Sequence, residues 1–230
     1  MTDGDSHFSQ DTFAFLAGLA ASNNRQWFMD NKQRYEDEVR TPAINFIEAM
    51  APKLERISKH FIASGKKSGG SLMRVYRDVR FSRDKTPYKD NIGIQFRHAL
   101  GRDAHAPGYY VHISVDRCFV GAGAWRPDAD VLAKIRRAMD DNARAWKKAR
   151  DDMGFQRTYY LAGESLKRPP RGYAKDHPLI EVLKRKDFIG ISEVSNDDVL
   201  RGGFVDNVAG RFTSAGPYMR FLCRALGVGF

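Results

Sequence analysis

The chain has 230 residues, and 42% of them are hydrophobic, which is enough for a sizeable buried core. Its 38 Lys and Arg residues outnumber its 28 Asp and Glu residues, and the formal charge of +10 favours anionic partners such as nucleic acid, phosphorylated small molecules or acidic proteins. No stretch approaches about 18 consecutive apolar residues, and the acidic first residues lack the apolar region of a signal peptide, so we expect no membrane span. The same charge also suits a basic protein that gains only solubility from it.

The two cysteines, Cys118 and Cys223, lie far apart, and neither belongs to a CxxC pair. Each sits in an apolar stretch, so both are expected to be reduced thiols of the core. Free core thiols are typical of cytosolic proteins, and we therefore expect a cytoplasmic location.

The first sixty residues are expected to be helical. Ser9 can cap a short helix, residues 22–24 then break and re-cap the chain, and Pro42 takes a first-turn position before a further run of apolar residues at helical spacing. The Gly- and Ser-rich residues 65–71 are expected to form a flexible connector.

The middle of the chain alternates apolar and polar residues, as half-buried strands do. We predict four strands, over residues 73–82, 92–96, 109–116 and 118–125. The turn between the second and third strands is predicted over residues 101–108. Because the connections are short, we expect antiparallel neighbours in a meander with one polar face.

The last hundred residues are expected to return to helices. An amphipathic helix with a basic outer face is predicted over residues 128–150, a loop-rich stretch over 159–173, a short helix over 178–188 and a last helix from Gly216. We therefore predict a single α+β domain over residues 1–230, in which a central antiparallel sheet of about four strands is covered by N-terminal and C-terminal helices.

Several segments resemble DUF2461, a family of conserved hypothetical proteins from bacteria and fungi. The most specific is RDVRFSRDKTPYK at residues 77–89. FLAGLAASNNRQWFMDNKQRYEDEV, YYVHIS, VGAGAWRP and PRGYAKDHP match in the same order, over roughly residues 13–190. The family has no established activity, so the resemblance implies this extent and no mechanism.

Cationic and phenolic side chains are concentrated in residues 72–90. They are Arg74, Tyr76, Arg77, Arg80, Arg83, Lys85, Tyr88 and Lys89, and three aspartates are interleaved with them. Guanidinium, ammonium and phenol groups can surround a phosphate or carboxylate, but they can also pair with neighbouring aspartates. This stretch is therefore predicted to be either an anion-binding site or a structural lattice of ion pairs. Arg77 breaks the alternation and would need a carboxylate or several carbonyls if its side chain were buried.

A second candidate lies on the polar face of the third predicted strand, where Tyr110, His112 and Ser114 project together. His112 is the histidine that we would test as a general base, and Tyr110 would orient a ligand or move protons. The alternative is a histidine that is merely hydrogen-bonded on a half-exposed sheet.

A third candidate follows Gly121 and Gly123, which permit close approach of the backbone. Trp125 and Arg126 could stack on a base or ring, or could simply end a strand before the next helix. The spacing of these glycines differs from that of a dinucleotide-binding motif.

Motifs of established chemistry do not appear. His105 and His112 are seven residues apart without metal-ligand spacing, and no P-loop or GxSxG motif is present, so we expect no metal and no cofactor. We predict a protein that binds an anionic small molecule over the polar face of the sheet, and the sequence does not decide whether it is an enzyme. A nucleic-acid-binding protein and a partner-binding module are the alternatives, and the oligomeric state is open.

Overall fold

The structure, a computed structural model of the chain, describes residues 6–100 and 107–230. Its first part is helical, as predicted, with α1 (Gln10–Ala21), α2 (Arg25–Asp30), α3 (Lys32–Arg34), the π-helical turn η1 (Tyr35–Arg40) and α4 (Thr41–Ile57). Ser9 and Thr12 form a capping box at the start of α1. The chain continues from η1 into α4 without a break, and the carbonyl of Glu38, four residues before Pro42, accepts a hydrogen bond from the Thr12 hydroxyl at 2.7 Å in place of the N–H that proline lacks.

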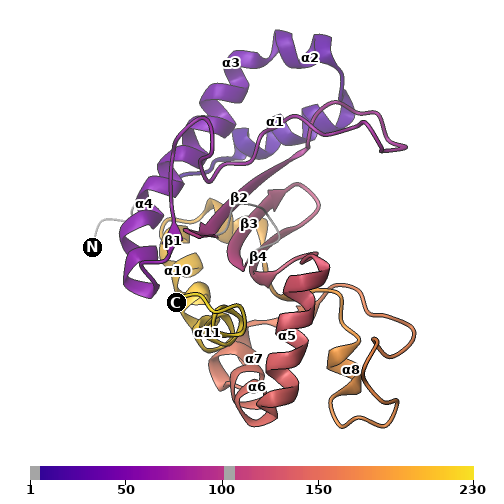
Figure 1. Cartoon of the computed structure of the whole chain (residues 1–230). Coiled ribbons are helices and arrows are strands. Elements are labelled where there is room, and N and C mark those ends of the chain that lie inside the picture. The colour runs from indigo at the N-terminus through magenta and orange to yellow at the C-terminus, as the bar shows by residue number, and fades with distance from the viewer. Residues whose placement is uncertain (1–5, 101–106) are drawn as a thin grey trace.

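The six strands that the structure describes form one antiparallel sheet in the order β1-β2-β3-β4-β6-β5, of which Figure 1 labels β1 to β4. They are β1 (Phe61–Ile62), β2 (Asn91–His98), β3 (Gly108–Ser114), β4 (Cys118–Ala124), β5 (Tyr160–Ala162) and β6 (Phe188–Val194). The predicted α+β fold is confirmed, and β2, β3 and β4 form the predicted meander. The turn predicted over residues 101–108 falls largely outside the described residues.

The strand predicted over residues 73–82 is wrong. Within it only Tyr76 forms an isolated bridge, with Tyr88, and Leu72 just before it forms another with Ile94. Residues 74–89 leave the edge of β2 and return as an irregular hairpin, which we call the arm (Figure 1). Two bonds hold its base: the Lys89 N–H donates to the carbonyl of Val75 at 2.7 Å, and the Arg77 N–H donates to that of Pro87 at 2.9 Å. A charged residue among the apolar positions and a proline on the return path prevent a regular ladder.

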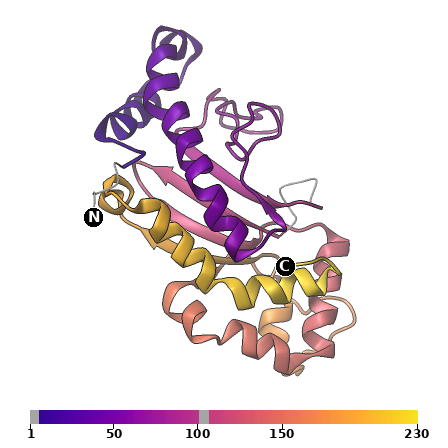
Figure 2. The ribbon, with the colours of Figure 1, turned by 90° about the vertical axis from the view of Figure 1, so that its left-hand side faces the viewer.

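The helices that pack on the sheet lie on one of its faces. Figure 2 shows α4, α10 (Phe204–Ser214) and α11 (Gly216–Ala225) in front of the strands. Tyr109 of β3 meets Phe212 of α10 there with ring centroids 4.3 Å apart, and both side chains are fully buried. This face therefore carries the core, formed by N-terminal and C-terminal helices as predicted.

The remaining helices are α5 (Ala129–Asp141), α6 (Ala143–Arg150), α7 (Met153–Thr158), α8 (Ile180–Leu183) and α9 (Asn196–Leu200). The single helix predicted over residues 128–150 is broken at Asn142, whose side chain accepts a hydrogen bond from the backbone N–H of Ala145 at 2.9 Å and so caps α6. The helix predicted over residues 178–188 is shorter, because the chain enters β6 at Phe188.

Cys118 and Cys223 are both buried and unpaired, as expected of core thiols. In residues 6–100 and 107–230, no helix has the length and apolarity needed to cross a membrane. The same residues hold no group of three His, Cys, Asp or Glu side chains suited to a metal ion. His105 lies outside the described residues.

Candidate functional site

The face of the sheet that points away from α4, α10 and α11 is hollowed by a cavity of about 530 Å³, which we call the trough. Side chains of β2, β3, β4 and β6 line it, with Met73 and Lys89 at the β2 edge and Ala162 and Gly163 at the β5 edge. Met73 is fixed there because its N–H donates to the carbonyl of Gly93 in β2 at 2.8 Å. The trough thus covers parts of four strands, and its volume is in the size range of small-molecule sites.

Glycines form the floor of the trough. Gly121 lies opposite Tyr110 of β3 and Ile191 of β6. A methyl group at Gly121 would lie 3.4 Å from Ile189 and 3.5 Å from Tyr110, which is ordinary contact, so packing does not demand a glycine. Gly123 differs, because its φ is +136° and a methyl group there would collide with the carbonyl of Phe188. Gly121 therefore leaves a space on the floor of the trough that the packing of the protein does not require to stay empty.

The register of the strands gives the trough two different ends. At one end Gly93, His112 and Phe119 lie side by side on β2, β3 and β4. At the other end Gly123 of β4 lies beside Ile189 of β6. The first end is polar and the second is mostly apolar.

His112 is the centre of the polar end. Its Nδ1 lies 3.4 Å from the Asn91 amide nitrogen and 3.3 Å from the Tyr110 hydroxyl. Because the amide nitrogen of Asn91 can only donate, Nδ1 of His112 is the accepting nitrogen, and the proton of the neutral ring is on Nε2. Burial lowers the pKa of His112 below its ordinary 6.5, and Arg117 lowers it further against an opposing effect of Asp90. His112 is therefore neutral at pH 7.

Tyr110 stays protonated at the same pH, since burial raises its pKa to about 12 despite a hydrogen bond from Asn91. Its ring lies over Gly93, where an added methyl group would come within 2.8 Å of the hydroxyl. Gly93 is therefore required by the position of Tyr110. The predicted pair of Tyr110 and His112 is brought together by β3 with Asn91 as a third member.

Charged groups at the polar end differ in how they are compensated. Arg117 donates to Glu193 at 2.5 Å and to the Tyr160 hydroxyl at 2.9 Å, and its guanidinium lies 4.7 Å from the Phe119 ring. Phe119 in turn stacks on His112 with centroids 4.7 Å apart. Arg117 and Glu193 thus neutralise each other and fix one wall of the trough.

Lys89 brings an uncompensated charge. Its ammonium donates to the backbone carbonyl of Arg74 at 2.9 Å, and among the residues that the structure describes it has no carboxylate partner. Burial lowers the pKa of Lys89, and the nearby Arg74 lowers it further. An anion beside this half-buried ammonium would stabilise its charged form against both burial and the repulsion from Arg74.

The apolar end is formed by Ile189, Ile191 and Trp125. The Trp125 side chain is 49% exposed, and the Arg126 guanidinium lies 5.0 Å from its ring. The backbone N–H of Arg126 donates to Asp187 at 2.7 Å, which holds this strand end in place. Arg126 itself does not line the trough, so of the third candidate only Trp125 and the two glycines do.

The predicted arm residues other than Lys89 lie outside the trough. Three of them are satisfied within the arm, as in the predicted lattice. Arg77 donates to Asp84 at 2.5 Å and to Thr86 at 2.6 Å, Arg80 donates to Asp78 at 2.6 Å, and Lys85 donates to the Val79 carbonyl at 2.9 Å. Arg77 is thus not buried in the core, and its ion pair is partly exposed.

The two arm tyrosines pack on the N-terminal helices. Tyr88 stacks on Phe28 with ring centroids 4.1 Å apart, and Tyr76 meets Tyr88 at 5.3 Å. Arg74 and Arg83 are exposed, and within the described part of the chain neither has a hydrogen bond or ion pair from its side chain. A ligand-binding role for these arm residues stays a prediction.

A family model described as Conserved hypothetical protein (DUF2461) matches residues 11–221. The chain belongs to this family. Comparisons with curated proteins and with solved structures found no match. The DUF2461 match covers the arm, every strand and all but the end of α11, so it contains the whole trough. Its description names no activity, and the function must therefore be argued from the site.

Sequence reasoning missed several residues of the DUF2461 trough, among them Asn91, Phe119, Ile189 and Ile191. The isoleucines belong to β6, which was not predicted as a strand. Their signal was present, since FIGISEV carries apolar residues on both faces, which is typical of a strand buried on one side and lining a cavity on the other.

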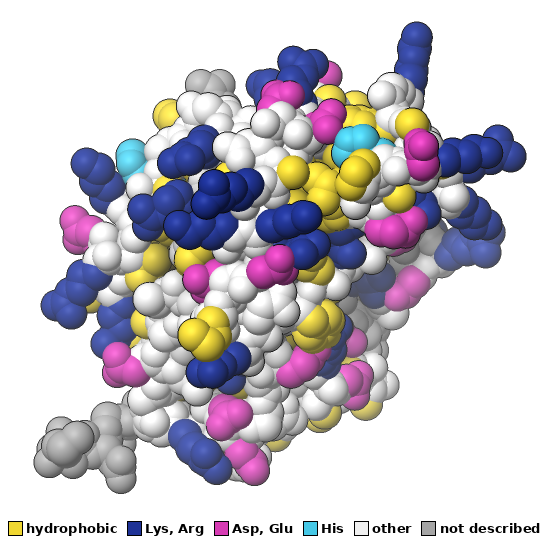
Figure 3. Space-filling model, turned by 90° about the horizontal axis from the view of Figure 1, so that it is seen from below, with side chains coloured by type: hydrophobic (Ala, Val, Ile, Leu, Met, Phe, Trp, Pro, Cys, Tyr) yellow, Lys and Arg dark blue, Asp and Glu magenta, His cyan; other side chains and the backbone are white. Residues whose placement is uncertain are grey.

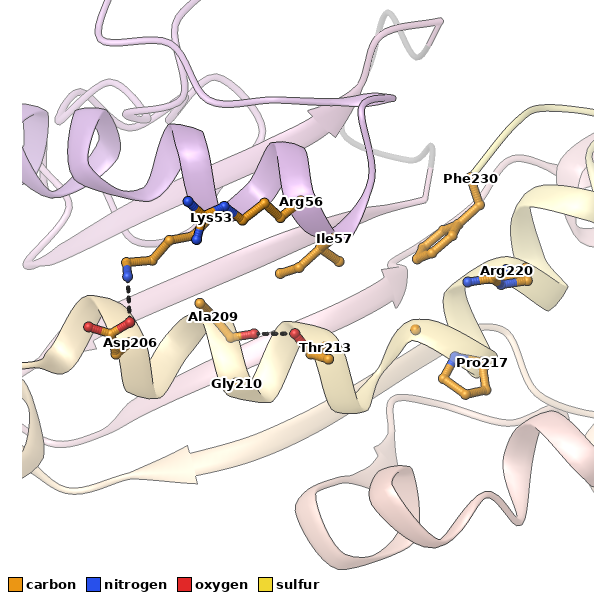
Figure 4. A pocket seen from close by; sticks show the side chains of 11 residues that line it. Lys53, Arg56, Ile57, Asp206, Ala209, Gly210, Thr213, Pro217, Arg220 and Phe230 are labelled. Carbon is orange, nitrogen blue, oxygen red and sulfur yellow. Dashed lines mark hydrogen bonds and ion pairs between the residues drawn. The ribbon is translucent and has the colours of Figure 1, made fainter.

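A second hollow of about 450 Å³ lies on the helical side, between α4, the α10–α11 junction and the C-terminal Phe230 (Figure 4). Lys53 is paired there with Asp206, and the Arg220 guanidinium lies 4.9 Å from the Phe230 ring. Thr213 is bonded back to the carbonyl of Ala209 at 2.9 Å. Because Lys53 and Thr213 are already partnered and the Arg56 side chain is exposed, this smaller hollow is a weaker candidate than the trough.

Proposed function

We propose that this protein binds a small ligand with a flat apolar body and an anionic group in the trough. The observation that carries the proposal is the division of the trough, with Lys89, Tyr110 and His112 at one end and Ile189 and Ile191 around a glycine floor at the other. A flat ring fits over a floor without side chains, and the anion would lie beside the uncompensated ammonium of Lys89.

The neutral His112 and the protonated Tyr110 support a more specific role. His112 presents an N–H at Nε2, and Tyr110 an O–H, so both can donate to a ligand oxygen. Because the lowered pKa keeps the ring neutral, its Nδ1 has a lone pair that could take up a proton in exchange for the hydrogen bond from Asn91, as a general base would. We propose these two as the groups that orient the ligand or move its protons, without assigning a reaction.

The experiment uses a matched set of probes. 1-Naphthyl phosphate has both the ring and the anion, 1-naphthol lacks the anion, and inorganic phosphate lacks the ring. We expect thermal stabilisation by the phosphate ester alone, since ligand at about 100 times its Kd stabilises a protein by about 2.7 kcal/mol. Equal binding of the ester and 1-naphthol would contradict recognition of an anion.

Matched variants test whether 1-naphthyl phosphate binds in the trough. Lys89→Met removes the ammonium but keeps much of the side-chain volume, and it should weaken binding of 1-naphthyl phosphate. Lys85→Met makes the same change in charge on the arm, outside the trough, and should leave binding unchanged. Equal losses in both variants would mean that the ester binds elsewhere.

The cellular location is also a proposal. Two unpaired buried cysteines fit a reducing compartment, which supports a cytoplasmic protein. The location is tested by fractionating cells that express the full chain at native level.

A further inference from the structure

Two basic segments flank the trough at opposite edges of the sheet. The arm rises from the β2 edge, and residues 163–179, which we call the basic loop, leave the β5 edge (Figure 1). Four strand intervals separate β2 from β5 in the order of the sheet, so at about 4.8 Å per interval the two edges are about 19 Å apart. Positive charge therefore lies on both sides of the trough rather than at one point.

The cations on both segments are available. On the arm, Arg74 and Arg83 are exposed and unpaired among the described residues. The basic loop adds Lys167, Arg168, Arg171 and Lys175, all exposed and, over residues 6–100 and 107–230, without a hydrogen bond or ion pair from the side chain. The carboxylate of Glu164 at the start of the loop is already bound to Lys186 at 2.9 Å.

A small anion needs only the charge at Lys89. Cations on both sides of the sheet instead match a series of phosphates, which a polynucleotide backbone provides. Two rings between the two segments suit its bases, because Trp125 and Tyr160 are each 49% exposed. Open sheets that bind RNA stack about two or three bases on such rings.

We propose that the ligand of the trough is one nucleotide of a single-stranded nucleic acid, with its base over Gly121 and the neighbouring phosphates on the arm and the basic loop. This inference rests on the proposed function and names the class of its ligand. A duplex does not meet the requirement, because its bases are paired and stacked and cannot lie flat on the glycine floor.

Charge alone does not determine where the nucleic acid binds, since Lys and Arg side chains also gather elsewhere on the surface. Figure 3 shows such a group on the face of the molecule seen from below. Lys147 and Lys148 of α6 are exposed cations away from the trough, and α6 packs beside α5 and α11. They supply a control that removes the same charge from a different surface.

The test measures the affinity of the full chain for a fluorescein-labelled oligo(dT) of about 12 nucleotides, within the range of about 4–16 nucleotides that one single-strand-binding module covers. Oligo(U), dTMP and a duplex of the same length are compared with it over a series of salt concentrations. The variants are Arg74→Ala/Arg83→Ala on the arm, Lys167→Ala/Arg171→Ala on the basic loop and Lys147→Ala/Lys148→Ala on α6 as the control.

We expect the single strand to bind at least about ten-fold tighter than dTMP or the duplex. Each site double variant should reduce the salt slope by about 1.4, from about 0.7 for each lost phosphate contact on a single strand, while the α6 control keeps its affinity. Preference for oligo(U) over oligo(dT) would identify the strand as RNA.

Three results would overturn the inference. Equal losses in the site and control variants, or equal affinity for the duplex, would show general attraction to a basic surface. Binding of dTMP or 1-naphthyl phosphate as tightly as the oligonucleotide would leave the proposed function standing and remove the polynucleotide. Absence of binding by all of these probes would remove both proposals.

Discussion

Substitution by alanine should have opposite effects on stability at Gly121 and Gly123, two glycines of β4 on the floor of the trough. In Gly121→Ala the new methyl group makes ordinary contacts at 3.4 Å and 3.5 Å, and the backbone lies outside the left-handed region. We expect the free energy of unfolding to rise by about 0.5 kcal/mol, because alanine restricts the unfolded chain. The same methyl group occupies the floor on which a flat ligand would lie, so affinity for 1-naphthyl phosphate should fall about ten-fold, or about 1.4 kcal/mol.

Gly123→Ala is the matched contrast, two residues along the strand. Its φ of +136° and the collision with the Phe188 carbonyl should destabilise the fold by about 3 kcal/mol. Urea unfolding followed by circular dichroism measures both variants, and calorimetry measures binding. A large loss of stability in Gly121→Ala would refute the geometry of the floor, and unchanged affinity in a stable Gly121→Ala would refute the trough as the site.

Five further substitutions test other parts of the structure. Trp146→Ala, at a fully buried side chain, should destabilise by about 3–5 kcal/mol in urea unfolding, whereas Trp125→Ala, at a half-exposed one, should cost much less and mainly weaken binding. Arg80→Ala breaks an exposed pair with Asp78 and a contact with the exposed Phe81 ring, so an unchanged melting temperature is expected, and a large drop would show that these contacts shape the arm. The pKa of His112 is lower in the folded protein than its ordinary 6.5, so the unfolded chain binds the proton more readily. The free energy of unfolding should therefore fall as the pH drops below about 6.5, and it should fall less steeply in His112→Asn. Urea midpoints at pH 7.5 and 5.5 measure this difference. Gly210→Ala, in open space within α10, should raise stability by about 1 kcal/mol, and a loss would reveal a contact at that turn.

Alternation predicted those strands that have one apolar face in the core and one polar face toward the trough. β2 and β3 keep this contrast along their length, and they were found with nearly correct bounds. β6 does not, since Ile189 and Ile191 face the trough while Phe188 faces the core, so its pattern is continuous rather than alternating. The arm shows the reverse error, because alternating residues without a neighbouring strand to pair with form no sheet.

The candidate site was predicted only as far as neighbours on one strand allow. Tyr110 and His112 share a face of β3 by simple alternation, and their association was therefore visible in the sequence. Asn91 joins them because of the register between β2 and β3. Gly121 forms the floor because of its neighbours in β3 and β6. Such information arises from pairing and is not contained in the spacing of residues along the chain.

The anion site and the ion-pair lattice, which the sequence leaves as alternatives, need not exclude each other. The pairs of Arg77 with Asp84 and Arg80 with Asp78 lie toward the tip of the arm, whereas Lys89 lies at its base, two residues before the start of β2. Pairs within the tip reduce the number of conformations open to a hairpin that lacks a regular ladder. They therefore favour a fixed position for its base, where the one half-buried ammonium without a carboxylate partner among the described residues enters the trough.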